Sequence, residues 1–371
     1  ELTNLVSWYN LKDTVLGSNL VTNGDFASDS DWTKVNNVTI ANGIATMSAD
    51  SGTADLKQTN PIPADKRSQI QFTILSSDVS SNTGLQLMST YGIDVSQDDD
   101  GNYIKDVGTH TITGTSSSAD QLFFRLTSGA GTLTVDDVSV KEVLAKDSTA
   151  TNNGSIYGAT TLTDAYSASS PFLPRIQDKA SDTVANYGEV YGGNAVSFDG
   201  TNDYISITDN DSLSFGDGST DSAFTVSAWV KMDDANEFVF INKGTYNSNG
   251  EWIFATNNED KISFWTMDES VASCRIGREF TTAITSYENQ WIHLAGTYNG
   301  NSSASGFRIY LNGSRIDNGD KVSNASSYVA MENQGADVYV GRYSSIYSNG
   351  SIANVQIFNT ALTQDQVREL Y

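Results

Sequence analysis

Aromatic side chains that interrupt the apolar pattern of the predicted strands are the residues best placed to contact a ligand. Aromatic rings stack on the apolar faces of sugars, while amide and carboxylate groups hydrogen-bond to sugar hydroxyls. In the run 261–266, Ile262 and Phe264 share one face of a predicted strand, so Trp265 points to the other face. The alternative for each ring is half-buried packing in a loop or sheet. The candidate carbohydrate contacts are Trp265, Tyr246, Tyr343 and Tyr347.

Residue sets suited to catalysis are not visible in the sequence. A retaining glycosidase needs two carboxylates about 5–5.5 Å apart, which alternating acidic residues on one strand would supply. Asp268 and Glu269 are adjacent, so on a strand they point to opposite faces. His110 and His293 are far apart and Cys274 is the only cysteine, which argues against a zinc cluster or a Cys–His pair. We therefore expect a binding protein rather than an enzyme.

Composition narrows the class of partner. The chain has 371 residues, enough for two hydrophobic cores, and a formal net charge of −24. With 21 Lys and Arg against 45 Asp and Glu there is no basic stripe, so nucleic acid is a poor partner. No apolar run is long enough to insert into a membrane. The acidity fits a neutral glycan or a bound cation, and it fits equally a saline environment with no specific ligand.

The elements that must position these residues read as strands. Short apolar runs separated by Gly, Asn, Asp and Ser recur along the chain, which predicts an all-β protein built of sandwiches. Asn312 and Gly313 predict a type I′ hairpin turn. Thr363 with Gln366 forms a capping box, which predicts a short helix at the end of the chain. The irregular stretch 160–190 is expected to be a surface loop, or else a boundary segment that packs against a neighbouring subunit.

A strand-like run at 5–13 has its expected continuation, at 147–158, only after a long interruption. Residues 1–17 together with 145–371 resemble the laminin-G-like and concanavalin A-like lectins of secreted bacterial and bacteriophage proteins. The resemblance implies a concanavalin A-like sandwich. It also places Asp199 in a Phe-Asp-Gly phrase near a metal in some relatives, although Ala353 and Asn354 replace the acidic pair expected later. The matching phrases lie at 193–200, 224–230, 291–295, 310–313 and 352–359.

The interruption has its own beginning, Asn-Gly-Asp-Phe at 23–26, and its own end, Asp-Asp-Val-Ser-Val at 136–140. These phrases resemble the ends of galactose-binding-like jelly rolls in carbohydrate-binding modules. Residues 18–144 are therefore expected to form a second sandwich inserted into the first, since adjacent termini let a domain be inserted without strain. The resemblance implies a structural calcium held by Asp25 and Asp136. The alternative is that Asp25 only fixes a turn.

The two resemblances imply a noncatalytic glycan-binding surface protein. The specific expectation is a bacteriophage virion component, such as a tail, fibre or capsid-decorating adhesin. Its partners would be a polysaccharide or cell-surface glycan and other virion subunits, on a virion surface or in an extracellular setting. One alternative is a structural virion or filament protein whose sandwiches contact neighbouring subunits and bind no sugar. Another is a secreted bacterial adhesin, or the binding portion of a larger glycoside-active enzyme.

Overall fold

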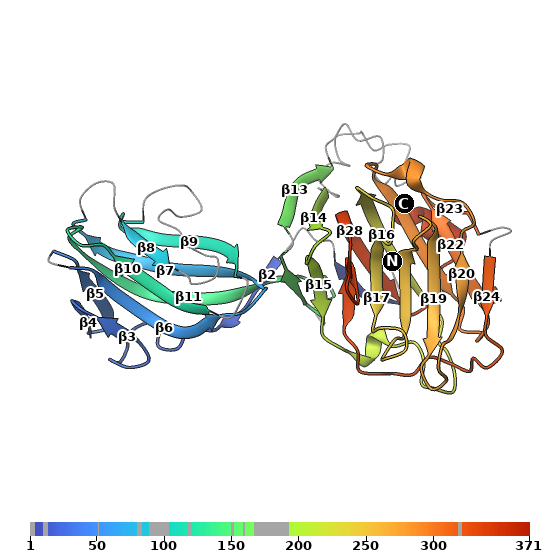
Figure 1. Ribbon diagram of the computed structural model, residues 1–371, viewed down its shortest axis with the longest axis horizontal. Coiled ribbons are helices and arrows are strands. Elements are labelled where there is room, and N and C mark those ends of the chain that lie inside the picture. The colour runs from blue at the N-terminus through green and yellow to red at the C-terminus, as the bar shows by residue number, and fades with distance from the viewer. Residues whose placement is uncertain are drawn as a thin grey trace. The chain divides into compact units, whose positions relative to one another are not determined.

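The computed structural model describes residues 4–9, 14–50, 52–79, 84–88, 104–116, 120–149, 152–158, 160–166, 193–317 and 321–371. The chain divides into two compact units, and Figure 1 labels many of their strands. Unit 1 comprises Glu1–Thr14 and Ala145–Tyr371, and unit 2 comprises Val15–Leu144. Unit 1 is thus assembled from two separate stretches of the sequence.

One sheet of unit 1, here the β16 sheet, has the strand order β13-β14-β28-β16-β21-β22-β23, with β1 also paired to β28. Its neighbouring strands run antiparallel. The strands are β1 (Leu5–Tyr9), β13 (Thr160–Tyr166), β14 (Gly193–Asp199), β16 (Phe224–Met232), β21 (Ile292–Tyr298), β22 (Phe307–Leu311), β23 (Ser314–Arg315) and β28 (Asn349–Phe358).

The other sheet of unit 1, here the β19 sheet, has the order β24-β20-β19-β18-β17-β25-β15-β12 and is also antiparallel. A small hairpin, β26 (Arg342–Tyr343) with β27 (Ile346–Tyr347), follows β25. The strands are β12 (Gly154–Tyr157), β15 (Tyr204–Ile207), β17 (Val239–Lys243), β18 (Trp252–Thr256), β19 (Ile262–Asp268), β20 (Cys274–Glu279), β24 (Lys321–Asn324) and β25 (Val338–Val340).

The core of unit 1 lies where aromatic residues of the two sheets meet. Phe264 of β19 makes edge-to-face contacts with Phe224 of β16 and Phe307 of β22, with ring centroids 5.4 and 5.2 Å apart. Edge-to-face rings are a favoured geometry that adds to the free energy of burying their area. The two sheets therefore form a sandwich, and the predicted all-β fold class is confirmed.

Strand β1 is tied to the later part of unit 1 by Asp147. The buried Asp147 carboxylate accepts hydrogen bonds from Ser7 Oγ at 3.2 Å and from the Trp8 main-chain N–H at 2.9 Å. The Ser148 N–H donates to the Trp8 carbonyl at 2.8 Å, and β1 pairs with β28. The sequence phrases at 5–13 and 147–158 thus meet in space through their described residues.

The local signals at the turn and at the chain end are confirmed. Asn312 and Gly313 both have positive φ, +50° and +70°, and connect β22 to β23. Helix α2 (Gln364–Leu370) is capped by Thr363, and the reciprocal bonds with Gln366 complete the capping box. Among the described residues of this unit, three short 3₁₀ helices connect strands: η2 (Asp211–Leu213), η3 (Thr285–Tyr287) and η4 (Ala304–Gly306).

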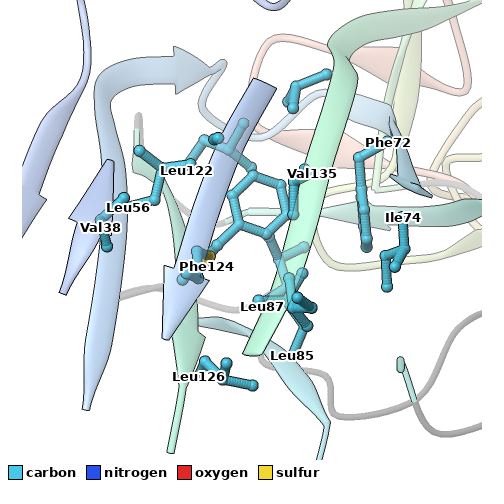
Figure 2. Close-up of a cluster of buried hydrophobic side chains, with 14 of the residues drawn as sticks. Val38, Leu56, Phe72, Ile74, Leu85, Leu87, Leu122, Phe124, Leu126 and Val135 are labelled. Carbon is cyan, nitrogen blue, oxygen red and sulfur yellow. The ribbon is translucent and has the colours of Figure 1, made fainter. Parts of the chain in front are cut away.

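Unit 2 is a smaller sandwich with one contiguous core (Figure 2). Strands β3-β6-β10-β8 form one sheet, while β4, β5, β7, β9 and β2 extend from β11 in the other. Phe124 of β10 packs edge-to-face on Phe72 of β7, with centroids 5.0 Å apart. The strands are β2 (Thr14–Asn19), β3 (Thr33–Val35), β4 (Val38–Ala41), β5 (Ile44–Ser48), β6 (Ala54–Ile62), β7 (Arg67–Ser77), β8 (Leu85–Met88), β9 (Gly108–Thr115), β10 (Asp120–Leu126) and β11 (Thr132–Ala145).

The predicted surface loop at 160–190 is corrected at its start. Residues Thr160–Tyr166 form β13, which pairs with β14 at the edge of the β16 sheet. The rest of that stretch, from 167 onward, lies outside the described residues. Within the described part of the chain, no helix has the length and apolar character required to cross a membrane.

Candidate functional site

Strand register places the predicted aromatic residue Trp265 in a row that crosses the β19 sheet. Trp265 pairs with Ile253, Ile253 with Asn242, and Asn242 with Tyr339. Directly paired residues of antiparallel strands present their side chains on the same face. Because Phe264, the neighbour of Trp265, points into the core, this row lies on the face turned away from the β16 sheet. We call it the outward face.

Trp265, Tyr246 and Tyr343, three of the four predicted sugar contacts, form one cluster, here the tryptophan cluster. Trp265 is 8% exposed, and the exposed Arg275 places its guanidinium 4.5 Å from the Trp265 ring centroid and 5.0 Å from that of Tyr246. The Tyr246 main-chain N–H donates to the Tyr343 hydroxyl at 3.0 Å. The arrangement joins one loop and the three strands β19, β20 and β26 of unit 1.

Two glycines permit this arrangement. A Cβ on Gly277, the residue paired with Trp265 on β20, would lie 2.9 Å from Cε3 of the indole, so only glycine lets the ring rest there. Gly244 opens the loop that presents Tyr246, with φ +72°, and a Cβ there would lie 1.9 Å from the Asn249 carbonyl oxygen. A left-handed backbone conformation of this kind is strained for residues with a side chain.

Tyr347, the fourth predicted contact, lies in a different group, here the tyrosine–arginine cluster. Tyr157 and Tyr204 stack with centroids 4.2 Å apart and planes 5° from parallel. Tyr339 and Tyr347 lie 6.0 and 6.2 Å from Tyr204. Arg342 lies over three of the rings, 4.5 Å from Tyr204, 5.2 Å from Tyr339 and 5.6 Å from Tyr347. Burial, followed by the neighbouring Tyr157, raises the pKa of Tyr204 to about 12, so its hydroxyl stays protonated.

The β26–β27 hairpin contributes to both clusters, because successive residues of a strand point to opposite sides. Arg342 contacts the tyrosine rings, while the next residue, Tyr343, reaches the main chain of Tyr246. Asn242, which lies in the row between Ile253 and Tyr339, is fully buried, and its Oδ1 has no hydrogen-bond partner among the described residues. A buried amide oxygen without a partner is costly unless a ligand or water supplies a donor.

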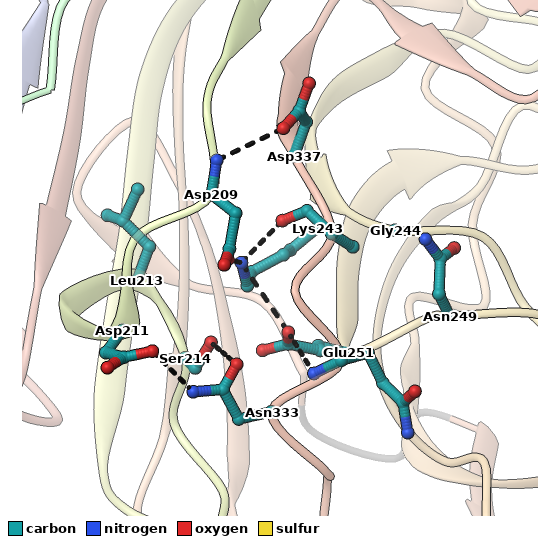
Figure 3. A network of polar contacts seen from close by, with 12 residues as sticks. Asp209, Asp211, Leu213, Ser214, Lys243, Gly244, Asn249, Glu251, Asn333 and Asp337 are labelled. Carbon is teal, nitrogen blue, oxygen red and sulfur yellow. Dashed lines mark hydrogen bonds and ion pairs between the residues drawn. The ribbon is translucent and has the colours of Figure 1, made fainter.

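A buried ionic network holds the loops at one end of unit 1 (Figure 3). Lys243 is fully buried; its Nζ pairs with Asp209, donates to the Ala336 carbonyl at 2.6 Å and lies 3.5 Å from Glu251 Oε1. Glu251 also accepts the Gln334 N–H at 3.1 Å. Burial raises the pKa of Glu251 to about 7 although Lys243 opposes the shift. The network joins three loops, and the side chains of Lys243 and Glu251 at its centre are fully buried.

Asp25 and Asp136, the predicted calcium ligands, lie near each other in unit 2. The Val138 N–H donates to the Gly24 carbonyl at 2.8 Å, so the first and last segments of this unit are adjacent. Burial raises the pKa of Asp136, and the charges of Asp137 and Asp25 add to the shift. A bound cation relieves such repulsion between carboxylates. Carboxylate oxygens are also the ligands that hard cations such as calcium prefer, so Asp25 and Asp136 are suitable ligands in chemical type.

Asp199, the predicted metal ligand of unit 1, forms a turn. Its Oδ1 accepts the main-chain N–H groups of Thr201 at 2.8 Å and Asn202 at 3.3 Å. Asp203 accepts the Asp199 N–H at 3.0 Å, and burial together with the Asp199 charge raises the pKa of Asp203 to about 6. Within the described ranges, no three His, Cys, Asp or Glu side chains come together closely enough to hold one metal ion.

The histidines and the cysteine lie inside the sandwiches. His293 is buried, and burial lowers its pKa to about 3, so it is neutral. His110 stacks on Phe72 with centroids 5.6 Å apart. Cys274 is buried and free. None of the three is placed on the outward face of the β19 sheet beside the two aromatic clusters.

No curated protein matches the sequence. Among solved structures, domain 4 of AbnA, a GH43 extracellular arabinanase from Geobacillus stearothermophilus in complex with arabinotriose, is 19% identical, covering 60% of this chain and 91% of that chain with a TM-score of 0.35. The binding domain of botulinum neurotoxin serotype G is 19% identical with a TM-score of 0.37; the match covers 62% of this chain but only 48% of that one. A native heptameric SAP-like pentraxin from Limulus polyphemus is 18% identical, with 47% and 79% covered and a TM-score of 0.30.

A family match covers the larger part of unit 1. Residues 199–368 match the family described as the concanavalin A-like lectin/glucanases superfamily. The matched range runs from the end of β14 into α2 and includes Trp265, Tyr246, Tyr343 and Tyr347. Residues 199–368, which build the larger part of the sandwich in unit 1, therefore match the model of the concanavalin A-like lectin/glucanases superfamily.

Proposed function

We propose that unit 1 binds glycans without cleaving them and that the ligand lies on the outward face of the β19 sheet. The row of paired residues in which Trp265 and Tyr339 flank Asn242 supports this most. The flanking clusters offer aromatic rings to the apolar face of a sugar. The superfamily of residues 199–368, which unites lectins with glucanases, agrees with a saccharide ligand.

Binding rather than hydrolysis is proposed because the carboxylates beside the tryptophan cluster hold loops. Glu269 accepts the Asn247 N–H at 2.8 Å, and Glu332 accepts the N–H groups of Glu269 at 2.8 Å and Ser270 at 3.2 Å. Glycoside cleavage needs one carboxylate as acid and a second as base or nucleophile, both facing the scissile bond. Carboxylate oxygens occupied by main-chain donors are poorly suited to either role.

The test is binding of the purified chain to a broad glycan array, followed by calorimetric titration of the glycans that bind. Tyr246→Ala and Trp265→Ala should each weaken binding about fivefold to tenfold, because each removes a stacking ring. Tyr287→Ala is the matched control, since Tyr287 is a half-buried tyrosine in η3 that belongs to neither cluster. Melting curves of all variants establish that they are folded.

Three results would contradict the proposed function or its site. If the folded wild-type chain binds nothing on the array, glycan binding is wrong and the structural role is favoured, in which the sandwiches contact only neighbouring subunits. Release of reducing sugar from a bound glycan would contradict binding without cleavage. Equal affinities for Tyr246→Ala, Trp265→Ala and Tyr287→Ala would place the ligand away from the tryptophan cluster.

The wider setting that we propose follows from the resemblances noted in the sequence. Unit 2 would be a carbohydrate-binding-module-like jelly roll inserted into unit 1, with a structural calcium at Asp25 and Asp136. A second cation at Asp199 would be weaker, because its turn already uses one carboxylate oxygen. The protein would act at a virion surface or outside the cell, as an adhesin among other subunits. Microscopy of virions labelled with an antibody against the chain tests that setting.

A further inference from the structure

Arg342 is held as a flat cation by aromatic rings. Its guanidinium carbon lies 4.5 Å from the Tyr204 centroid, and Tyr157 stacks against Tyr204 at 4.2 Å. Tyr339 and Tyr347 also lie within 5.6 Å of the guanidinium. A guanidinium over aromatic faces keeps its N–H donors in its own plane, where a ligand can reach them. Stacking therefore fixes the orientation of Arg342 without using its hydrogen bonds.

The hydrogen-bonding capacity of Arg342 is mostly unused. Nε donates to the Ser344 carbonyl at 3.0 Å. In the part of the chain that the structure describes, its two terminal nitrogens donate no hydrogen bond and no carboxylate forms an ion pair with it. The negative charge of Asp337 acts on Tyr339 of the same cluster. The Asp337 carboxylate accepts hydrogen bonds from Ser206 Oγ at 2.9 Å and from the Asp209 N–H at 3.1 Å.

This is unusual for a chain with more than twice as many acidic as basic residues, 45 against 21. Most other arginines with an assigned partner pair with a carboxylate: Arg125 with Asp55, and Arg278 and Arg315 with Asp317. Arg342 is half-buried, so part of this residue is open to solvent. A planar guanidinium with free terminal N–H groups matches a carboxylate in two parallel hydrogen bonds.

We propose that the tyrosine–arginine cluster is a binding site for a sugar that carries a carboxylate, with Arg342 as the carboxylate partner. This inference rests on the proposed function and adds the ligand class. The carboxylate of a hexuronate-type residue accepts hydrogen bonds from the terminal nitrogens of Arg342. The sugar ring packs on the tyrosine side chains around Arg342, and the tyrosine hydroxyls hydrogen-bond to the sugar hydroxyls. Neutral sugars lack the group that Arg342 is oriented to bind.

The experiment compares each polymer in two forms that differ only at the carboxyl group, which is charged in one form and methylated and neutral in the other. Polygalacturonate, alginate and hyaluronate are titrated into the full chain by calorimetry, each as the free acid and as its methyl ester. We expect at least one free acid to bind about tenfold more tightly than its ester, the effect of a charge-assisted, two-fold hydrogen bond. Because this comparison uses wild-type protein, it does not depend on the folding of any variant. Sulfated dextran serves as a test for binding to anionic charge alone.

Variants then assign the preference to one residue. Arg342→Gln should bind acid and ester equally, and Arg342→Lys should retain only part of the preference, because a lysine keeps the charge but not the planar fork. Arg368→Gln is the matched control; it removes the same charge from an exposed arginine on α2, which is outside both clusters. Its acid preference should equal that of the wild type.

The outcomes separate this inference from the proposed function. Binding of neutral glycans or esters with no gain for the free acids would overturn the carboxylate site and leave glycan binding intact. If sulfated dextran and every uronate bind equally, and high salt abolishes that binding, the preference for free acids is only unspecific attraction to negative charge. An acid preference that survives in Arg342→Gln would assign the carboxylate to another cation. If the folded chain binds none of these polymers and no glycan on the array, both proposals are wrong.

Discussion

Replacing Lys243 with methionine is the sharpest test of how the loops of unit 1 are held. The change keeps the apolar stem but removes a cation that is fully buried among Asp209, Glu251 and the Ala336 carbonyl (Figure 3). Glu251 is itself fully buried, and its Oε2 already lacks a hydrogen-bond partner among the described residues. The variant therefore leaves a carboxyl group in the interior without its cation.

The expected cost at pH 7.5 is about 3–5 kcal/mol in the free energy of unfolding, the range for removing one partner of a buried ion pair. A pH dependence follows from Glu251. Burial raises its pKa to about 7, against the opposing effect of Lys243, so loss of the lysine raises this pKa further. An acid whose folded-state pKa exceeds its unfolded value loses stability as pH rises towards the folded value. The deficit of Lys243→Met should therefore grow above pH 7 by about 1.4 kcal/mol per pH unit.

Urea unfolding followed by tryptophan fluorescence is the appropriate assay, because every tryptophan except Trp32 lies in unit 1. The double variant Lys243→Met with Glu251→Gln should recover part of the loss and remove the extra pH dependence. Lys231→Met, at a half-buried position of β16, is the matched control and should change stability by less than about 0.5 kcal/mol. A loss below about 1 kcal/mol for Lys243→Met, with a pH profile like that of the wild type, would refute the reasoning.

Three further predictions concern pH, calcium and the independence of the units. The pKa of Asp203 is raised to about 6 by burial and by Asp199, so Asp203→Asn should match the wild type at pH 4 and exceed its stability by about 1 kcal/mol at pH 7.5 in thermal melts. Calcium should raise the melting temperature of the wild type but not of Asp136→Asn; equal shifts would refute this site. Phe124→Ala should destabilise unit 2 by about 3–5 kcal/mol while the unit 1 transition in calorimetry stays in place.

Local patterns predicted the elements of this protein well. The alternation in 261–266 correctly placed Ile262 and Phe264 in the core and Trp265 on the opposite face. The Asn-Gly pair at 312–313 and the capping box at Thr363 are satisfied as expected, since each depends only on neighbours in sequence. The irregularity of 160–190 was misleading at its start, because pairing with β14 makes a strand of residues without a strong strand pattern.

The tyrosine–arginine cluster could not be predicted in the same way. Tyr157, Tyr204 and Tyr339 come from β12, β15 and β25, and only the register between these strands brings them together. A signal was present, since Tyr204 and Tyr339 each alternate with buried aliphatic residues and so must face outward. The burial of Lys243 was equally hard to predict. It ends an apolar strand, and two of its partners, Asp209 and the Ala336 carbonyl, come from loops distant in sequence.

The pairing of β1 with β28 has a consequence for synthesis. On the ribosome, Leu5–Tyr9 is made roughly 350 residues before its partner β28, a delay of about 20–70 s. Unit 2 is complete by residue 144, so it can fold while β1 is still unpaired. Because β28 lies between β14 and β16, a nascent chain that stops before residue 349 lacks the centre of the β16 sheet and leaves three strand edges open to aggregation. Premature termination should therefore be far more damaging here than an equally short loss from an edge strand.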